Sequence, residues 1–165
     1  MKNIFHRRKK GITDYSKRKK LLISGIPRIV FRRTNRYIIA QYVTTKEAKD
    51  SIEIGVTSKN LEKYGWDKEF EGSLKSIPAA YLTGLLIGKK IIKEKKKLPI
   101  FDIGMISSAA KTKPYAFLKG LVDSGLKISY GSKDLFPEED RIKGKSLKKD
   151  FSKMYEKIKL NIEKE

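Results

Sequence analysis

The sequence predicts an α/β fold in which a mixed sheet combines an antiparallel hairpin with βαβα units. Two observations predict this class. Residues 27–58 contain three runs rich in β-branched and aromatic residues, the first two around a turn signal. Residues 77–160 then alternate helix-periodic stretches with short apolar runs, which is typical of strands joined by helices. The 165 residues show no internal repeat and are enough for one buried core, so we expect a single domain.

The first twenty residues are expected to form a basic arm, because they are too polar to build a core. Two blocks of four basic residues, Arg7–Lys10 and Lys17–Lys20, flank the short element Thr13-Asp14-Tyr15. We hypothesise that this element holds the arm in one bent path, with Asp14 capping a turn, so that the two blocks reach different phosphates.

The sheet is expected to begin with a hairpin over residues 27–43, turning at Thr34-Asn35-Arg36, since Asn tolerates the left-handed conformation of tight turns. A third strand is predicted over residues 51–58. There Ile52, Ile54 and Val56 alternate with Glu53 and Gly55, so one face of the strand should be buried.

Helices and strands should alternate after an irregular stretch at residues 59–76. Ser76 can cap a helix that has Pro78 in its first turn and runs to about Lys96, where lysines oppose the helix dipole. A buried strand is predicted at residues 98–105, and a second helix from Pro114 to Gly125.

The remaining residues predict a strand at 126–131, a short turn at 137–144 and a basic amphipathic helix at 146–160. The apolar face of that helix would consist of Phe151, Met154, Tyr155 and Ile158. We therefore expect three regions: the arm (1–20), a single α/β domain (21–144) and a basic C-terminal helical tail (145–165).

Composition excludes several classes of protein. The chain has no cysteine, which excludes a disulfide scaffold, Cys-based zinc sites and thiol catalysis, and suits a reducing compartment. No apolar signal-peptide region is visible near the start, and the longest apolar run, Ala79–Gly88, is too short to span a membrane. A soluble cytoplasmic protein is expected.

Charge is the most informative number. The formal net charge is +20, and residues 1–36 alone carry thirteen Lys or Arg against the single acid Asp14. An excess this large repels itself unless a polyanion neutralises it, so the composition indicates nucleic acid or an anionic surface.

The enzyme readings are weak. The only histidine, His6, lies in the arm without an orienting partner. Asp102 sits in a buried-strand context, but two-metal phosphoryl chemistry needs several converging carboxylates, so a structural role near the strand end is favoured. Gly84–Lys90 fails as a phosphate loop, because its glycine spacing is one residue short and no Ser or Thr follows the lysine. Gly84 and Gly88 instead predict close helix packing.

The hairpin carries a cluster of arginines, with Tyr37 beside the turn. Arg guanidinium groups bind phosphate bidentately and stack on bases, and a Tyr ring can stack on an unpaired base. Arg32 and Arg33 should face opposite sides of their strand. The alternative is an arginine-rich edge strand that only prevents sheet-to-sheet association. Lys111 and Lys113 precede a helix start, where free N–H groups could seat a phosphate.

The motifs together resemble one family. "RRKKGITDYSKRKKLL", "RRTNRYIIAQ", "YGW", "IPAAYLTGLLIGKK", "DIGMISSAAKTKPYAFLKGLVDSGLKI" and "PEEDRIKG" occur in order and cover most of the chain to about Gly144. They resemble the archaeal and eukaryotic large-subunit ribosomal proteins of the L-eighteen family, called L-five in eukaryotes.

The resemblance implies a non-catalytic protein that binds 5S rRNA and seats it in the central protuberance of the large subunit. It implies a ribonuclease-H-like topology, no cofactor or metal, and as partners 5S rRNA, 23S-type rRNA and neighbouring ribosomal proteins, with no membrane and no homo-oligomer. Carried over by motif, the RNA-binding residues would be Arg7, Arg8, Lys9, Lys10, Thr13, Asp14, Tyr15, Arg18, Arg32, Arg33, Asn35, Arg36, Tyr37, Gln41, Lys111 and Lys113.

Two alternatives remain open at this point. One is a small Mg-dependent nuclease of ribonuclease-H-like fold, which the shortage of clustered carboxylates disfavours. The other is a general basic chaperone or membrane-surface binder, which would not need a patterned hairpin.

Overall fold

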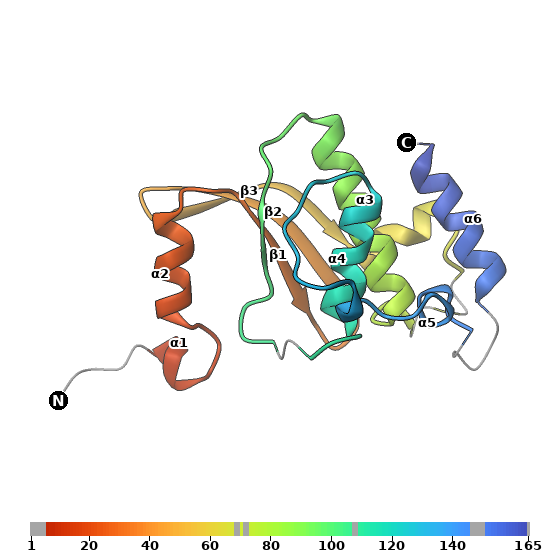
Figure 1. Ribbon diagram of the computed structural model, residues 1–165, viewed down its shortest axis with the longest axis horizontal. Coiled ribbons are helices and arrows are strands. Elements are labelled where there is room, and N and C mark those ends of the chain that lie inside the picture. The colour runs from red at the N-terminus through yellow and green to blue at the C-terminus, as the bar shows by residue number, and fades with distance from the viewer. Residues whose placement is uncertain (1–5, 68–69, 71–72, 107–108, 146–150, 165) are drawn as a thin grey trace.

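The computed structural model describes residues 6–67, 70, 73–106, 109–145 and 151–164. Its centre is a four-stranded mixed sheet in the order β3-β2-β1-β4 (Figure 1). The strands are β1 (Arg28–Arg33), β2 (Ile38–Lys46), β3 (Lys49–Thr57) and β4 (Ile100–Asp102). β2 pairs antiparallel with β1 and β3, whereas β4 pairs parallel with β1. The predicted α/β class and the mixed sheet with a hairpin are confirmed.

The β1–β2 hairpin turns where the sequence predicts. The Thr34 N–H donates to the Tyr37 carbonyl at 2.9 Å, and the Tyr37 N–H donates to Thr34 Oγ1 at 2.8 Å. The threonine side chain therefore closes the loop that carries Asn35 and Arg36.

The predicted burial of one face of β3 is right at two of its three apolar positions and wrong at the third. Ile54 and Val56 are buried, but Ile52 is 55% exposed. The register pairs Tyr42 with Ile54 and the next residue, Val43, with Ile52, so Glu53 is the extra residue of a β-bulge. Successive β2 side chains point to opposite faces, and the bulge therefore sends Ile52 to the face opposite Ile54.

Helices α3 (Ile77–Lys93) and α4 (Lys113–Asp123) cover one face of the sheet (Figure 1). Ser76 caps α3 as predicted, accepting the Ala79 N–H at 3.4 Å. The helix ends three residues before the predicted Lys96, because Lys95 adopts a left-handed φ of 49° and the Lys96 N–H turns back to the Ile91 carbonyl at 3.1 Å. Gly125, two residues after the last residue of α4, has a left-handed φ of 100° and terminates the helix, as predicted.

Glycines bring α3 and α4 into close contact, as predicted for Gly84 and Gly88. A Cβ on Gly84 would overlap the Phe117 carbonyl oxygen, and one on Gly88 would overlap the Ser124 side chain. From the other side, a Cβ on Gly120 would overlap the Tyr81 carbonyl oxygen. The two backbones can approach this closely only without side chains at the crossing.

Residues 126–131 do not form the predicted strand. Leu126 and Ile128 are buried, but the segment pairs with none of the described strands. A methyl of Leu126 lies 3.5 Å from where a Cβ on Gly88 would be, so this side chain packs against α3. The alternating burial of Leu126 and Ile128 therefore arises without strand pairing, although it gives the same sequence pattern as a sheet face.

The rest of the chain shows three further differences from the prediction. The irregular stretch contains a 3-10 helix, η1 (Ser58–Tyr64), and the predicted turn at 137–144 is largely helix α5 (Glu139–Lys143). The predicted strand at 98–105 is reduced to the three residues of β4. Residues 107–108 of the predicted loop and 146–150 of the predicted C-terminal helix lie outside the described residues. Another short 3-10 helix, η3, spans Lys133–Leu135.

The C-terminal helix α6 (Ser152–Glu163) contributes to the same hydrophobic core as the sheet. Phe151 is fully buried, with its ring 4.6 Å from Trp66 and 5.3 Å from Phe70. Tyr155 and Ile158 are buried and Met154 is partly buried, as the predicted apolar face requires. In the described part of the chain, no helix combines the length and apolarity that a membrane crossing needs.

Candidate nucleic-acid interface

The described part of the arm contains two short helices, α1 (His6–Lys9) and α2 (Tyr15–Ile23), with no buried residue in either. Asp14 caps α2 by accepting the N–H groups of Ser16 at 2.9 Å and Lys17 at 3.1 Å, which confirms the predicted capping role. Arg7 Nε donates to Thr13 Oγ1 at 3.0 Å across the bend. The turn chemistry therefore fixes the angle between the two basic blocks.

A shared carboxylate joins the arm to the sheet. Asp50, on β3, accepts from Arg18 of α2 at 2.9 Å and from Arg28 of β1 at 2.7 Å. Arg28 is only 4% exposed, so its positive charge is buried and the Asp50 carboxylate compensates it. Burial alone would raise the pKa of Asp50, but the hydrogen bonds from Thr45 and Arg18 and the charge of Arg28 outweigh it and lower that pKa.

Asp102, at the end of β4, has the structural role that the sequence favours. Its carboxylate accepts the Gly104 N–H at 2.8 Å and pairs with Arg32 at 3.2 Å, with Arg28 3.9 Å away. Among the described residues there is no group of three or more acidic or histidine side chains that could hold a metal ion. These contacts fix Arg32 and shape the turn that follows the strand.

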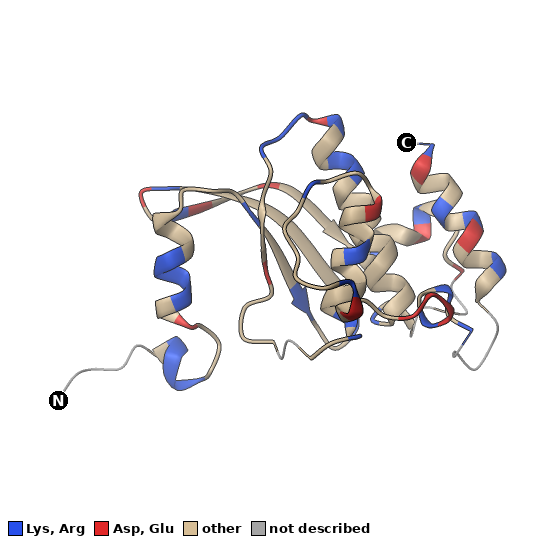
Figure 2. Cartoon of the chain, viewed as in Figure 1, with Lys and Arg blue, Asp and Glu red and all other residues tan. Residues whose placement is uncertain are grey.

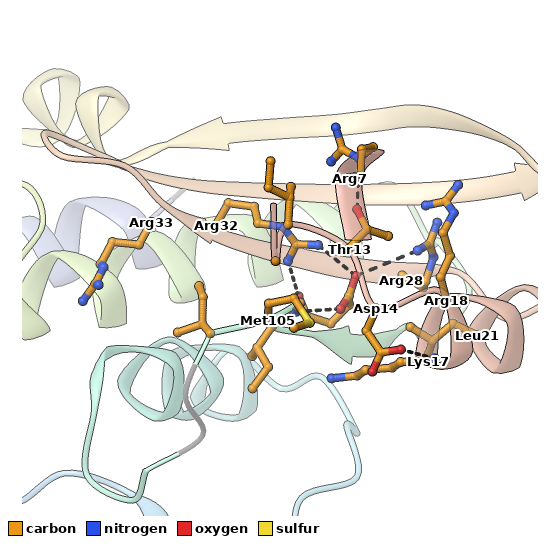
Figure 3. Close-up of a pocket in the computed structure, with 16 residues that line it drawn as sticks. Arg7, Thr13, Asp14, Lys17, Arg18, Leu21, Arg28, Arg32, Arg33 and Met105 are labelled. Carbon is orange, nitrogen blue, oxygen red and sulfur yellow. Dashed lines mark hydrogen bonds and ion pairs between the residues drawn. The ribbon is translucent and has the colours of Figure 1, made fainter. Parts of the chain in front are cut away.

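The arm, β1 and the turn after β4 enclose a cleft of about 570 Å³, which we call the arm cleft (Figure 3). Six of the predicted RNA-binding residues line it: Arg7, Thr13, Asp14, Arg18, Arg32 and Arg33. Segments far apart in sequence therefore bring their cations to one place.

A second cleft of about 500 Å³ lies before α4, and we call it the loop cleft. Its cationic residues are Arg33, Lys111, Lys113 and Arg141. Burial lowers the pKa of Lys113, and the nearby charges of Arg33 and Lys75 lower it further. Lys111 differs, since it pairs with Glu138 at 3.2 Å.

Arg33 lines both clefts, and its side chain points away from Arg32 (Figure 3), as the strand alternation predicts. Arg32 is committed to Asp102, whereas no ion pair or hydrogen bond of Arg33 occurs within the described part of the chain. Arg32 therefore holds the structure together, whereas Arg33 lines the clefts without such a contact among the described residues.

The other predicted site residues line neither cleft. Arg8, Lys9 and Lys10 are exposed in the arm, and Tyr15 is half-buried at the start of α2. Asn35 and Arg36 are exposed in the hairpin loop, Tyr37 packs partly against the core, and Gln41 is half-buried on β2 opposite Val30. Figure 2 shows Lys and Arg concentrated on α1 and α2.

The structure adds residues that the prediction did not include. Lys17 and Arg28 line the arm cleft, and Met105 lines both clefts. Lys17 lies in the second basic block and Arg28 in the arginine cluster, so charge could have indicated them. Nothing local in the sequence indicates Met105.

Comparison with known proteins identifies relatives. Residues 1–99 match the model of the family described as "Ribosomal large subunit proteins 60S L5, and 50S L18". The "Large ribosomal subunit protein uL18" of Methanoregula boonei is 44% identical over 143 residues, which cover 87% of this chain and 79% of that protein. The protein of the same name from Korarchaeum cryptofilum is 45% identical over 143 residues, covering 87% and 71%. The one from Methanoculleus marisnigri is 44% identical over 140 residues, covering 85% and 77%.

Proposed function

The chain belongs to the family of large-subunit ribosomal proteins 60S L5 and 50S L18, and from this premise we propose that it binds 5S rRNA and attaches it to the central protuberance. It is a structural, non-enzymatic constituent of the cytoplasmic large ribosomal subunit, so its partners are rRNA and other subunit proteins. Within that set the proposal names 5S rRNA first and 23S-type rRNA beside it. The ribonuclease-H-like topology and the division into arm, domain and tail stay predictions.

One observation carries the proposal: the bent arm and the arginine-bearing strand β1 face each other across one cleft. Arg7 and Lys17 come from the arm, and Arg33 comes from the sheet. Guanidinium groups presented from two elements can bind phosphates that a folded RNA brings together, whereas a flexible polycation would contact any phosphates it meets. This geometry supports recognition of a shape.

Some arginines of the cluster build the interface, and others are available to contact RNA. Asp50 and Asp102 hold Arg18, Arg28 and Arg32 in place. While the arm is docked, these carboxylates hold arginines of the cleft in place, so less side-chain ordering is left for binding. Arg33 and the arm lysines would then supply phosphate contacts.

The test is a salt series of binding to 5S rRNA, with an unrelated folded RNA of equal length as competitor. We expect tight binding that survives the competitor near physiological salt, with log K falling by about 0.9 per duplex phosphate neutralised for each decade of salt. Equal loss of both RNAs as salt rises would contradict the proposal, because charge alone would then explain the binding.

The nuclease alternative has lost its main candidate. The family is not enzymatic, and the Asp102 carboxylate is bonded to Arg32 and the Gly104 N–H. We expect neither the wild-type protein nor Asp102→Asn to cleave RNA. RNA cleavage by the purified protein that Asp102→Asn abolishes would instead support a nuclease.

A further inference from the structure

We propose that the loop cleft binds one unpaired nucleotide of the RNA, with its phosphate between Arg33 and Lys113 and its base against Met105. This inference rests on the proposed function and deepens it, because it assigns a nucleotide-sized site within the RNA-binding surface. The site differs from the arm cleft in its chemistry.

Two cations of the loop cleft, Arg33 and Lys113, have no counter-charge within the described residues, whereas Lys111 pairs with Glu138. No Asp or Glu is among the described residues that line it, whereas the arm cleft contains Asp14 and Asp102. Arg33 and Lys113 have no ion pair within the described residues, and Lys113 is partly buried beside the charges of Arg33 and Lys75. Like charges held together in this way favour an anion between them. A bound phosphate would relieve the repulsion.

The lining of the loop cleft also contains apolar residues. Ile77, Ile106, Ala109 and Pro114 line it together with Met105. A phosphate ion alone has no use for such a surface, and a base paired inside a duplex cannot reach it. An unpaired nucleotide offers both an anion and a flat apolar face, and about 500 Å³ is within the usual size of small-ligand sites.

Met105 is the most unusual residue of this wall. It is a large apolar side chain that is 55% exposed, and it lines both cationic clefts. Its turn is held firmly, because Gly104 has φ 65° and donates its N–H to Asp102 at 2.8 Å. A Cβ on Gly104 would lie 2.9 Å from the Arg32 guanidinium carbon and would displace that side chain, and the φ of 65° itself favours glycine. The structure therefore presents a polarizable thioether, which contacts aromatic rings favourably.

The experiment observes the methionine methyl group directly. The chain has three methionines, Met1, Met105 and Met154, so ¹³C-methyl labelling gives a spectrum with few signals. On adding 5S rRNA to the full chain, we expect the Met105 methyl signal to move upfield, since the ring current of a stacked base shields it. Met154, which packs partly against the core on α6, is the internal control.

Binding measurements separate the two halves of the site. Met105→Ala should weaken binding about two- to tenfold without changing the salt slope, because a thioether–base contact is not ionic. Lys113→Ala should weaken binding and reduce the slope by about one. The matched controls are Leu160→Ala, a side chain of similar exposure (56%) on α6, and Lys127→Ala, an exposed lysine beyond α4.

The outcomes distinguish this inference from the proposed function. A wild-type protein that does not prefer 5S rRNA to the competitor would overturn both. A specific complex in which the Met105 methyl signal does not move, and in which Met105→Ala binds like Leu160→Ala, would overturn only the nucleotide site.

Discussion

At the scale of single residues, the few carboxylates near the basic surface organise the cations around them. Asp14 caps α2, Asp50 bridges two arginines, and Asp102 fixes a third. Each removes formal positive charge from the proposed RNA-binding surface, yet each limits the conformations of groups that would otherwise move independently. Geometry here competes with net charge, and substitutions can decide between them.

Asp14→Ala tests this competition. Losing the cap should cost about 1 kcal/mol of α2 stability and weaken 5S rRNA binding, even though the protein becomes more positive. Affinity for 5S rRNA at fixed salt is the measurement. Asp14→Ser is the matched control, since it removes the same charge and keeps a capping oxygen. An affinity that rises in both variants would mean that the arm acts only as a polycation.

At the scale of elements, the Arg18–Asp50 ion pair joins the arm to the sheet, and it is about one-third exposed on each side. Pairs of this kind are worth no more than about 1 kcal/mol, so α2 should exchange between docked and released states. The docked state pre-organises the arm cleft. Its population is therefore a measurable property of the free protein.

Arg18→Met should release the arm without exposing the buried Arg28, because the Arg28–Asp50 pair remains. We expect amide hydrogen exchange of α2 to accelerate roughly two- to fivefold. Lys17→Met is the control, since it removes the same charge at the adjacent residue. Within the described residues, the Lys17 side chain makes no ion pair or hydrogen bond to the sheet. Equal exchange rates in the two variants would show that the Arg18–Asp50 contact does not hold the arm.

The docked arm should also resist mild acid. The pKa of Asp50 is lowered in the folded protein, so its contribution is complete above the ordinary value of 3.8 and is lost only as pH falls through the lower folded value. Protection of the α2 amides, corrected for intrinsic exchange, should therefore stay constant from pH 7 to about 5. A decline that begins near pH 6 would point to a group other than Asp50.

The α3–α4 crossing provides a stability prediction at the same scale. Ala normally favours a helix over Gly by about 1 kcal/mol. In Gly84→Ala the new methyl would meet the Phe117 backbone, so overpacking should dominate and lower the free energy of unfolding by about 1–3 kcal/mol. Denaturant unfolding measures it. Gly55→Ala is the control, because the nearest heavy atom to its Cβ is 4.0 Å away.

At the scale of the whole molecule, the arm and α6 lie at opposite ends (Figure 1). The arm has no buried residue in its helices, whereas α6 buries Tyr155, Ile158 and Ile162. The two ends of the chain therefore have different physical roles: one presents charge, and the other completes the core.

Phe151→Ala should separate these roles. Truncating a fully buried aromatic ring typically costs about 3–5 kcal/mol of unfolding free energy. At temperatures where the variant stays folded, its affinity for 5S rRNA should equal that of the wild type, because the change is far from the arm. Leu160→Ala, on the exposed side of α6, should change stability by no more than about 0.5 kcal/mol. A loss of affinity in a folded Phe151→Ala protein would connect α6 to RNA binding.

Much of the fold was predictable because local rules act over a few residues. Ser76 and Pro78 specify the start of α3, Gly125 lies at the end of α4, and Asp14 specifies the cap of α2. The charge pattern and the family motifs likewise indicated a ribosomal, RNA-associated chain. These features depend on neighbours in sequence, which the sequence itself displays.

The tertiary structure decided which distant residues meet. No local sequence signal indicates that a bulge turns Ile52 outward, or that residues 126–131 do not pair as a strand. The Arg18–Asp50 ion pair joins residues 32 positions apart in the sequence. The cations that line the loop cleft with Met105 include Arg33 of β1 and Lys113 of α4. Sequence periodicity reports that a side chain is covered, but what covers it depends on how the elements pack. The sequence by itself therefore determined the charge, the helix caps and the hairpin, whereas packing determined which other segments pair as strands and which residues line the clefts.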